Sequence, residues 1–327
     1  MYVDPFYVTA SSNHFNQKYP QDYERILKRN YLLNHEGEFE SVILGSSRSS
    51  FFQEGDFPSD LKIFNFSVSQ FLKHEYTPAL KWFQETQGNP KTIIVGADFF
   101  VTADGLMSSD DLVKYGTRQD VNRHNIYINM NIKNFIYHTF KMLLGGSFNE
   151  QYYQSEPFIR KFKSIYPDSD LIEGLETLLM FGYKHYKYKE DTLSTLKNMK
   201  SMADQSEFIM YIPVIHMDIF KYIYKNDAFD GYRRFIREIV YVFGYVYDFS
   251  GPNSVTTDKQ YFFDPSHFNY KISKCIAVKI TERQDSSCPS DFGVKVTKEN
   301  LEAYLDKLEA DTAAYLEAEK NQSASAN

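Results

Sequence analysis

Long apolar runs are missing from this sequence of 327 residues. A helix that crosses a membrane needs about 20 consecutive, mostly apolar residues, and no stretch of the chain approaches that length. The first residues also lack the apolar core of a secretory signal peptide. The printed sequence therefore predicts no membrane-spanning helix of its own.

Positive charge is in short supply. The chain has 36 Lys and Arg against 43 Asp and Glu, a formal net charge of -7, and no long basic stripe. Binding to nucleic acid depends on clustered cations that neutralise phosphates. Nucleic acid is therefore excluded as a partner.

Metal-ligand and nucleotide motifs are absent as well. No His-x-x-x-His pair or Cys/His cluster has the spacing of a zinc site, and no glycine-rich phosphate loop is present. We therefore predict neither a metal nor a cofactor. The two cysteines, Cys275 and Cys288, lie 13 positions apart without a C-x-x-C motif. One disulfide between them is feasible, but two thiols do not decide the cellular compartment.

What the sequence does contain is an alternation of short apolar runs and amphipathic helices. Its 43% hydrophobic and 24% charged residues are typical of a globular protein. Short continuous apolar runs suit a parallel sheet that is covered on both faces. The predicted strands are Ser41–Leu44, Leu61–Phe66, Thr92–Val95, Phe208–Ile212 and Tyr245–Phe249. The predicted helices between and after them are Gln21–Leu33, Phe71–Gln87, Asp230–Val240 and Phe268–Val278. This order predicts an α/β fold with a doubly wound, mainly parallel sheet.

The chain divides by pattern into three parts. Residues 1–40 form an N-terminal segment, residues 41–283 an α/β domain, and residues 284–327 a C-terminal helix with a mobile tail. Between about residues 110 and 202 helical periodicity replaces any clear strand pattern, as in Ile126–Leu144 and Leu171–Tyr186. We expect a helical insertion here that packs over or beside the substrate crevice.

The C-terminal helix has a recognisable start and a recognisable inner face. Thr297 is a good N-cap residue. An apolar stripe that should dock on the rest of the protein follows it, and consists of Leu301, Leu305, Leu308, Thr312 and Tyr315.

Serines follow the first predicted strand directly, in the segment Gly45-Ser46-Ser47-Arg48. The carboxyl edge of such a sheet is where ligands bind. Gly45 permits a sharp turn there, and a serine in that turn can expose its hydroxyl while backbone N–H groups face a developing oxyanion. An ordinary polar turn would have the same residues.

The second candidate element is Asp264-Pro265-Ser266-His267. His267 could serve as general base for a serine, with Asp264 fixing its tautomer and stabilising the imidazolium. Asp at an N-cap followed by Pro is also a favoured helix start by itself. His216, at the end of another strand, could face the same crevice or be a satisfied polar residue of the sheet edge.

Two further blocks lie between these elements, and their order resembles that of SGNH (GDSL-like) hydrolases. They are Asn65-Phe66-Ser67 and Gly96-Ala97-Asp98. The resemblance implies a Ser47–His267–Asp264 triad, with Ser67, Asp98 and Asn65 at the oxyanion hole. Asp98 departs from the family's Asn, because an ionised carboxylate cannot donate a hydrogen bond to an oxyanion.

The likeness is closer to a membrane-tethered branch that includes the D-alanyl transfer protein of teichoic acid synthesis and polysaccharide O-acyltransferases. Four segments carry it: Tyr2–Phe6, the Gly-Ser-Ser-Arg block, the Gly-x-Asp-Phe-Phe block at Gly96–Phe100, and Phe263–Phe268. The branch implies a site outside the cytoplasmic membrane, an acylated glycan or cell-wall polymer as substrate, and a membrane-bound O-acyltransferase as partner. It also implies that an N-terminal anchor has been removed here, although Met1 could equally be the native start.

These observations lead to one main hypothesis and two rivals. The first is a serine-dependent esterase or O-acyltransferase in which Ser47 attacks an acyl carbonyl and lies within hydrogen-bonding distance of His267. Arg48 could bind an anionic part of the substrate or pair with a surface carboxylate. The rivals are a non-catalytic SGNH-fold module that binds glycan or scaffolds an assembly, and a cytosolic esterase without a membrane connection.

Overall fold

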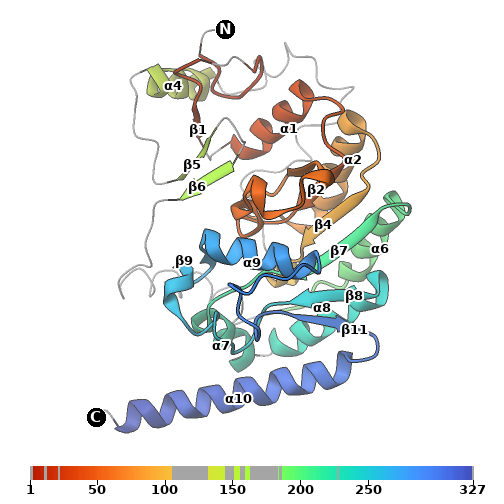
Figure 1. The fold of residues 1–327 in the computed structure, drawn as a ribbon, viewed down its shortest axis with the longest axis vertical. Helices are drawn as coiled ribbons and strands as arrows, with labels where there is room; N and C mark the ends of the chain where they lie inside the picture. The colour runs from red at the N-terminus through yellow and green to blue at the C-terminus, as the bar shows by residue number, and fades with distance from the viewer. Residues whose placement is uncertain are drawn as a thin grey trace. The chain divides into compact units, whose positions relative to one another are not determined.

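The structure is a computed structural model and describes residues 3–10, 13–20, 23–104, 132–143, 151–154, 159–162, 183, 186–226 and 228–325. Its main feature is a six-stranded sheet with the strand order β11-β8-β7-β4-β2-β3 (Figure 1). The strands are β2 (Ser41–Leu44), β3 (Ile63–Asn65), β4 (Thr92–Gly96), β7 (Glu207–Ile212), β8 (Tyr245–Asp248) and β11 (Val294–Thr297).

The sheet is mostly parallel, as predicted. β2 pairs with β3 and β7 pairs with β8 in parallel, whereas β11 is an antiparallel edge strand on β8. The chain runs from β2 outward to β3 and then from β4 toward β11. The strand order therefore reverses next to β2, the strand that precedes Ser47.

The inner strands form because their side chains are apolar on both faces. All four residues of β2 and all five residues of β4 are buried, as expected for a parallel sheet covered on both sides. The five predicted strands are confirmed. Strand β11 was not predicted, since two of its four residues are exposed and the run is not continuously apolar.

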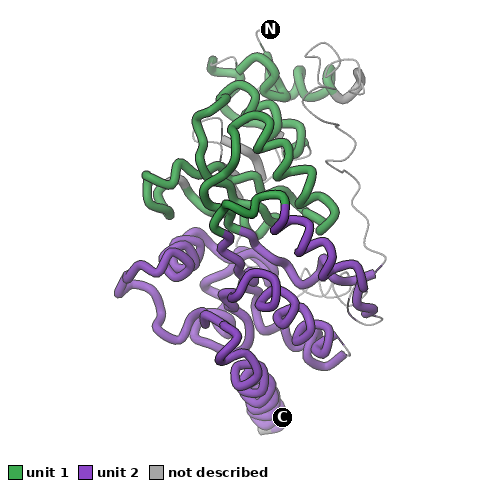
Figure 2. Tube along the Cα trace, turned by 90° about the vertical axis from the view of Figure 1, so that its right-hand side faces the viewer, with its two compact units in different colours: residues 1–94, 108–164, 202–207 green, residues 95–107, 165–201, 208–327 purple. Residues whose placement is uncertain are grey.

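The chain splits into two compact units, which Figure 2 shows in green and purple. Unit 1 comprises residues 1–94, 108–164 and 202–207, and unit 2 comprises residues 95–107, 165–201 and 208–327. Each unit has buried apolar side chains of its own, such as Val42, Phe66 and Phe83 in unit 1 and Ile236 and Ile276 in unit 2.

In unit 1, helices α1 (Glu24–Asn34) and α2 (Tyr76–Gln87) pack together, and α2 also contacts β2. Helix α4 (Ile132–Leu143) lies in the predicted insertion. The same insertion contains β5 (Gln151–Gln154) and β6 (Ile159–Phe162), which form a small antiparallel sheet with β1 (Lys18–Pro20). The expectation of a segment without strands was wrong here, because these short aromatic and β-branched runs are stabilised by a distant partner strand.

Unit 2 contains all but the last residue of α6 (Thr192–Met202), and it contains α7 (Met217–Lys225), α8 (Ala228–Phe243), α9 (Tyr270–Ile280) and α10 (Leu301–Ser325). It also holds the short antiparallel pair β9 (Phe262–Asp264) and β10 (His267–Phe268). The predicted insertion helix over Leu171–Tyr186 lies almost entirely outside the described residues.

The C-terminal helix docks on unit 2 as predicted, with Leu305, Leu308 and Thr312 buried. Its start was predicted wrongly, because Thr297 ends strand β11 and the helix begins at Leu301. The helix continues up to Ser325, into the polar tail that was expected to be mobile. The mobility of this tail stays a prediction.

Candidate functional site

Ser47 lies in the turn that follows β2. Of the two adjacent serines, Ser46 is 1% exposed and its Oγ accepts a hydrogen bond from the Arg48 N–H at 3.3 Å. Ser47 is half-buried, and its carbonyl accepts from the Ser50 hydroxyl at 2.6 Å. These hydrogen bonds therefore hold the turn around Ser47 in place. Of the two serines, Ser47 is the more accessible.

The segment Asn65–Val68 runs beside this turn because the parallel pairing of β2 and β3 continues past both strands. The Phe66 N–H donates to the Ile43 carbonyl at 2.9 Å, and the Val68 N–H donates to the Gly45 carbonyl at 3.0 Å. The structure thus brings the first two sequence blocks together within unit 1.

Two donors predicted for the oxyanion hole shape this loop. The Asn65 amide donates to the Ser49 carbonyl at 2.9 Å, and its oxygen accepts the Ser67 N–H at 3.0 Å. Either donor would have to exchange this bond to reach an oxyanion, so their oxyanion role stays a prediction.

Buried charges of α1, which were not predicted from the sequence, lie against the same loop and the chain that follows it. The Lys28 ammonium donates to the carbonyls of Asn65 and Ser67 at 2.7 and 2.6 Å. The Arg25 guanidinium forms a bidentate pair with Glu75 at 2.7 and 2.8 Å. The charged residues of α1 were visible in the sequence. Charges on a helix normally indicate a solvent-exposed face, so they did not predict buried contacts with this loop.

Asp264 and His267 form a hydrogen-bonded pair in unit 2. Asp264 Oδ2 lies 2.7 Å from His267 Nδ1, while Oδ1 accepts the N–H groups of Ser266 and His267 at 2.7 and 3.1 Å. Because a carboxylate only accepts, the ring donates from Nδ1 and leaves Nε2 as its basic nitrogen. Both side chains are partly accessible, 20% for His267 and 13% for Asp264.

The alternative reading of Asp264 as the N-cap of a helix was wrong. Asp264 and His267 face each other across the β9–β10 turn. Helix α9 starts only at Tyr270, and Asn269 is its N-cap, accepting from the Lys271 and Ile272 N–H groups. The carboxylate is therefore committed to the turn and to the histidine.

His216, the N-cap residue of α7, supports this turn. Its N–H donates to the Pro265 carbonyl at 2.9 Å, and its ring makes an edge contact with Phe262 at 5.3 Å between centroids. His216 Nδ1 also accepts the Asp218 N–H at 3.1 Å, which caps α7.

Asp98 follows β4 in unit 2 and is 1% exposed. It precedes the short 3-10 turn η6 (Phe99–Thr102), which its side chain does not cap. In unit 1 Arg48 is buried, with 7% of the residue exposed. Its role, as a ligand of an anionic substrate group or as the partner of a carboxylate, stays a prediction.

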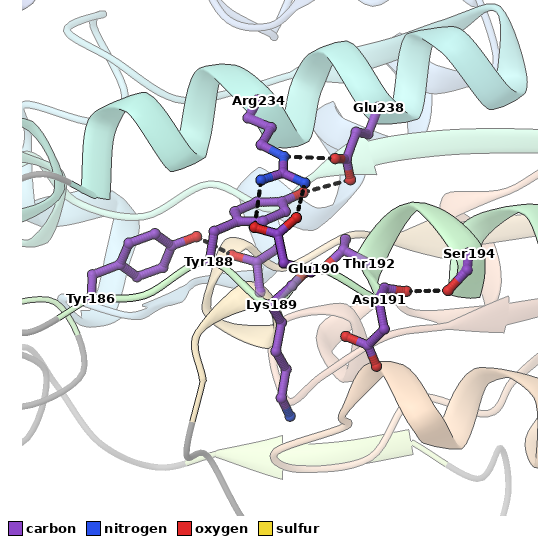
Figure 3. A network of polar contacts seen from close by, with 10 residues as sticks. Tyr186, Tyr188, Lys189, Glu190, Asp191, Thr192, Ser194, Arg234 and Glu238 are labelled. Atoms are coloured by element: carbon purple, nitrogen blue, oxygen red, sulfur yellow. Dashed lines mark hydrogen bonds and ion pairs between the residues drawn. The ribbon is translucent and has the colours of Figure 1, made fainter.

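A polar network connects the segment Tyr186–Thr192 with α8 and with Thr102 of η6 (Figure 3). Tyr186 shares a hydrogen bond with the Thr102 hydroxyl at 2.6 Å, and Tyr188 donates to Glu238 at 2.7 Å. Arg234 bridges Glu238 and Glu190. Burial raises the pKa of both tyrosines, so their hydroxyls stay protonated. The network fixes η6 directly after Asp98.

Within its units, then, the structure gathers the predicted residues into two groups. In unit 1, the turn that contains Ser47 lies beside the loop that contains Asn65 and Ser67, and in unit 2 Asp264 and His267 are hydrogen-bonded. The distance between Ser47 and His267 stays a prediction. Comparison of the chain with family models, curated proteins and solved structures found no match. Any functional conclusion therefore rests on the residues of this chain.

Two further features of the described residues bear on the type of site. The described residues contain no group of three or more His, Cys, Asp or Glu side chains arranged to hold a metal. In the described part of the chain, no helix is both long and apolar enough to cross a membrane.

Proposed function

We propose that this protein transfers acyl groups through a serine nucleophile, with Ser47, His267 and Asp264 as its triad. The observation that carries the proposal is the 2.7 Å contact between Asp264 and His267 Nδ1. It orients the imidazole and selects the tautomer with a basic Nε2, as a general base for a serine requires. The half-buried Ser47 follows β2, next to the reversal of strand order where ligands of doubly wound sheets bind.

The chemical steps follow from these roles. Ser47 Oγ attacks the acyl carbonyl while His267 Nε2 takes the hydroxyl proton, and Asp264 stabilises the imidazolium that forms. The tetrahedral intermediate collapses, and the leaving oxygen takes the proton back from His267. Water or a sugar hydroxyl then attacks the acyl-serine ester with the same base, which gives hydrolysis or O-acyl transfer and restores Ser47.

The proposal extends to fold type, substrate and location. An SGNH-type fold, an acylated surface glycan and a membrane-bound O-acyltransferase as partner follow from the resemblance of the four sequence blocks. The Cys275–Cys288 disulfide supports an extracytoplasmic site, because such bonds persist in oxidising compartments.

The second candidate function is a non-catalytic module that binds glycan or scaffolds a surface assembly. Asp98 favours it, since this carboxylate stands where the family places a donor for the oxyanion. The Ser67 N–H and the Asn65 amide already donate hydrogen bonds within the protein, which also favours a non-catalytic module.

Ser47→Ala tests the enzyme with Ser46→Ala as its neighbour control. If Ser47 is the nucleophile, hydrolysis of an activated acetyl ester falls about 10³-fold or more while the free energy of unfolding stays within about 0.5 kcal/mol. Ser46→Ala should keep most of the activity. Labelling with a serine-directed fluorophosphonate should disappear in Ser47→Ala alone. Loss of activity in Ser46→Ala alone would reassign the nucleophile to Ser46.

Asp98→Asn separates the enzyme from the scaffold. It supplies an amide donor at the predicted oxyanion hole and should raise a weak esterase activity about 10-fold or more. The assay is ester hydrolysis by wild type and variant at equal concentration. No hydrolysis and no fluorophosphonate labelling in either protein would instead favour the non-catalytic module.

A further inference from the structure

Helix α4 of unit 1 is fixed on one side by the N-terminal segment (Figure 1). His138 and Met142 are 4% and 3% exposed. The Phe6 ring stacks on Phe135 at 6.1 Å between centroids, and Tyr23 meets His138 edge-on at 5.1 Å. One face of the helix is therefore accounted for by contacts within unit 1.

The other face of α4 carries large apolar side chains exposed to solvent. Ile136, Tyr137, Phe140 and Leu143 are 47%, 60%, 59% and 42% exposed. Their spacing of one, three and three positions places them along one side of a helix. Elsewhere among the described residues, large hydrophobic side chains this exposed occur singly, as with Tyr241 and Val294. A contiguous apolar patch of this kind marks an interaction surface.

The charge of α4 indicates which kind of partner this apolar surface can bind. The helix contains Lys133 and Lys141 and no acidic residue, although the chain as a whole has a net charge of -7. The Lys141 ammonium lies 5.8 Å from the centre of the Tyr137 ring. A cation thus stands beside the exposed aromatic ring, which complements an apolar layer bordered by negative charge.

We propose that α4 binds the surface of an anionic lipid bilayer, lying in the plane of the interface. Its four exposed apolar side chains would enter the boundary between headgroups and acyl chains, with Lys141 at the level of the phosphates. Tyr and Phe are suited to this depth, since amphipathic and aromatic rings gather at membrane interfaces. Pairing of two copies through α4 is disfavoured, because the helix has no acidic residue to meet the lysines of a second copy.

The test is sedimentation of the 327-residue chain with phosphatidylglycerol vesicles and with phosphatidylcholine vesicles. Wild type should bind phosphatidylglycerol at least about 10-fold more tightly than phosphatidylcholine. Replacing both Ile136 and Phe140 with Ser should weaken binding to phosphatidylglycerol about 10-fold or more. Lys141→Glu should abolish the preference for the anionic lipid.

A matched pair of tyrosines controls for general exposure. Tyr137 and Tyr241 are 60% and 65% exposed, and each ring has a lysine ammonium above it at 5.8 and 5.2 Å. Tyr137→Ser should reduce vesicle binding, whereas Tyr241→Ser on α8 should not. Because these side chains are exposed, circular dichroism should show every variant folded.

Two results would overturn the proposal. Equal binding of wild type and the Ile136/Phe140 double variant would remove α4 from the interaction. Self-association in analytical ultracentrifugation that the same double variant abolishes, without any vesicle binding, would assign the face to a second copy. Neither result depends on Ser47, because ester hydrolysis is measured separately.

Discussion

At the scale of single residues, Lys28 is the side chain whose removal should most affect the loop Asn65–Val68, which lies beside the Ser47 turn. It is 1% exposed, and its ammonium satisfies the carbonyls of Asn65 and Ser67. Lys28→Met keeps the apolar stem but leaves both carbonyls without this donor. Because a buried hydrogen bond to a charged group is worth about 1.5–3 kcal/mol, we expect the free energy of unfolding to fall by about 2–3 kcal/mol.

Urea unfolding followed by circular dichroism measures this effect, with Lys81→Met as the control. Lys81 lies on α2 with a side chain that is 53% exposed, and its replacement should change stability by less than about 0.5 kcal/mol. If both variants unfold at the same urea concentration, Lys28 does not hold the loop. If the loop positions Ser47, Lys28→Met should also lower ester hydrolysis in protein that is still folded.

The candidate residues differ in how visible they are in the sequence. Asp264 and His267 could be paired from the sequence because they are three positions apart and share one turn. Lys28 could not be found in this way, since 37 and 39 positions separate it from the carbonyls it binds. Only the fold brings such partners together, and nothing in the local sequence indicates which carbonyl a lysine will meet.

At the scale of helices and strands, predictability follows burial. Strand β2 has the predicted bounds, Ser41–Leu44, because a continuous apolar run is a local signal. Strand β5 reads Gln-Tyr-Tyr-Gln and forms by pairing with β1, more than 130 positions earlier in the chain. Short strands of this kind depend on a partner, and the single sequence does not specify that partner.

Helix α10 shows which contacts attach an element. Arg233 pairs with Asp306, and Arg237 with Glu302, across the surface between α8 and α10. Exposed ion pairs of this kind contribute only about 0–1 kcal/mol each. The buried side chains of Leu305, Leu308 and Thr312 therefore provide most of the attachment. Their helical spacing is also why the docking face was predictable although the start of the helix was not.

At the scale of the whole molecule, the alternation of strands and helices in the sequence was enough to predict the fold class. Which residues pair with one another became known only from the structure. The cysteines belong to this second group. Their separation of 13 positions left pairing open, and the structure joins Cys275 in α9 to Cys288 with a Cα–Cα distance of 5.4 Å. The bond anchors the helix that follows the Asp264–His267 turn, and it links the stability of unit 2 to the redox state of the surroundings.

Replacing both cysteines with Ser should lower the free energy of unfolding by about 2–3 kcal/mol, because the bond closes a short loop and restricts the unfolded chain. Dithiothreitol should lower the melting temperature of wild type about as much as the double substitution does. It should leave the melting temperature of the double variant unchanged. Iodoacetamide should label both thiols only after reduction. Labelling of both thiols in unreduced protein from an oxidising compartment would contradict the pairing. A protein that depends on this bond is suited to a compartment outside the reducing cytoplasm, so a melting temperature insensitive to dithiothreitol would weaken the proposed extracytoplasmic location as well.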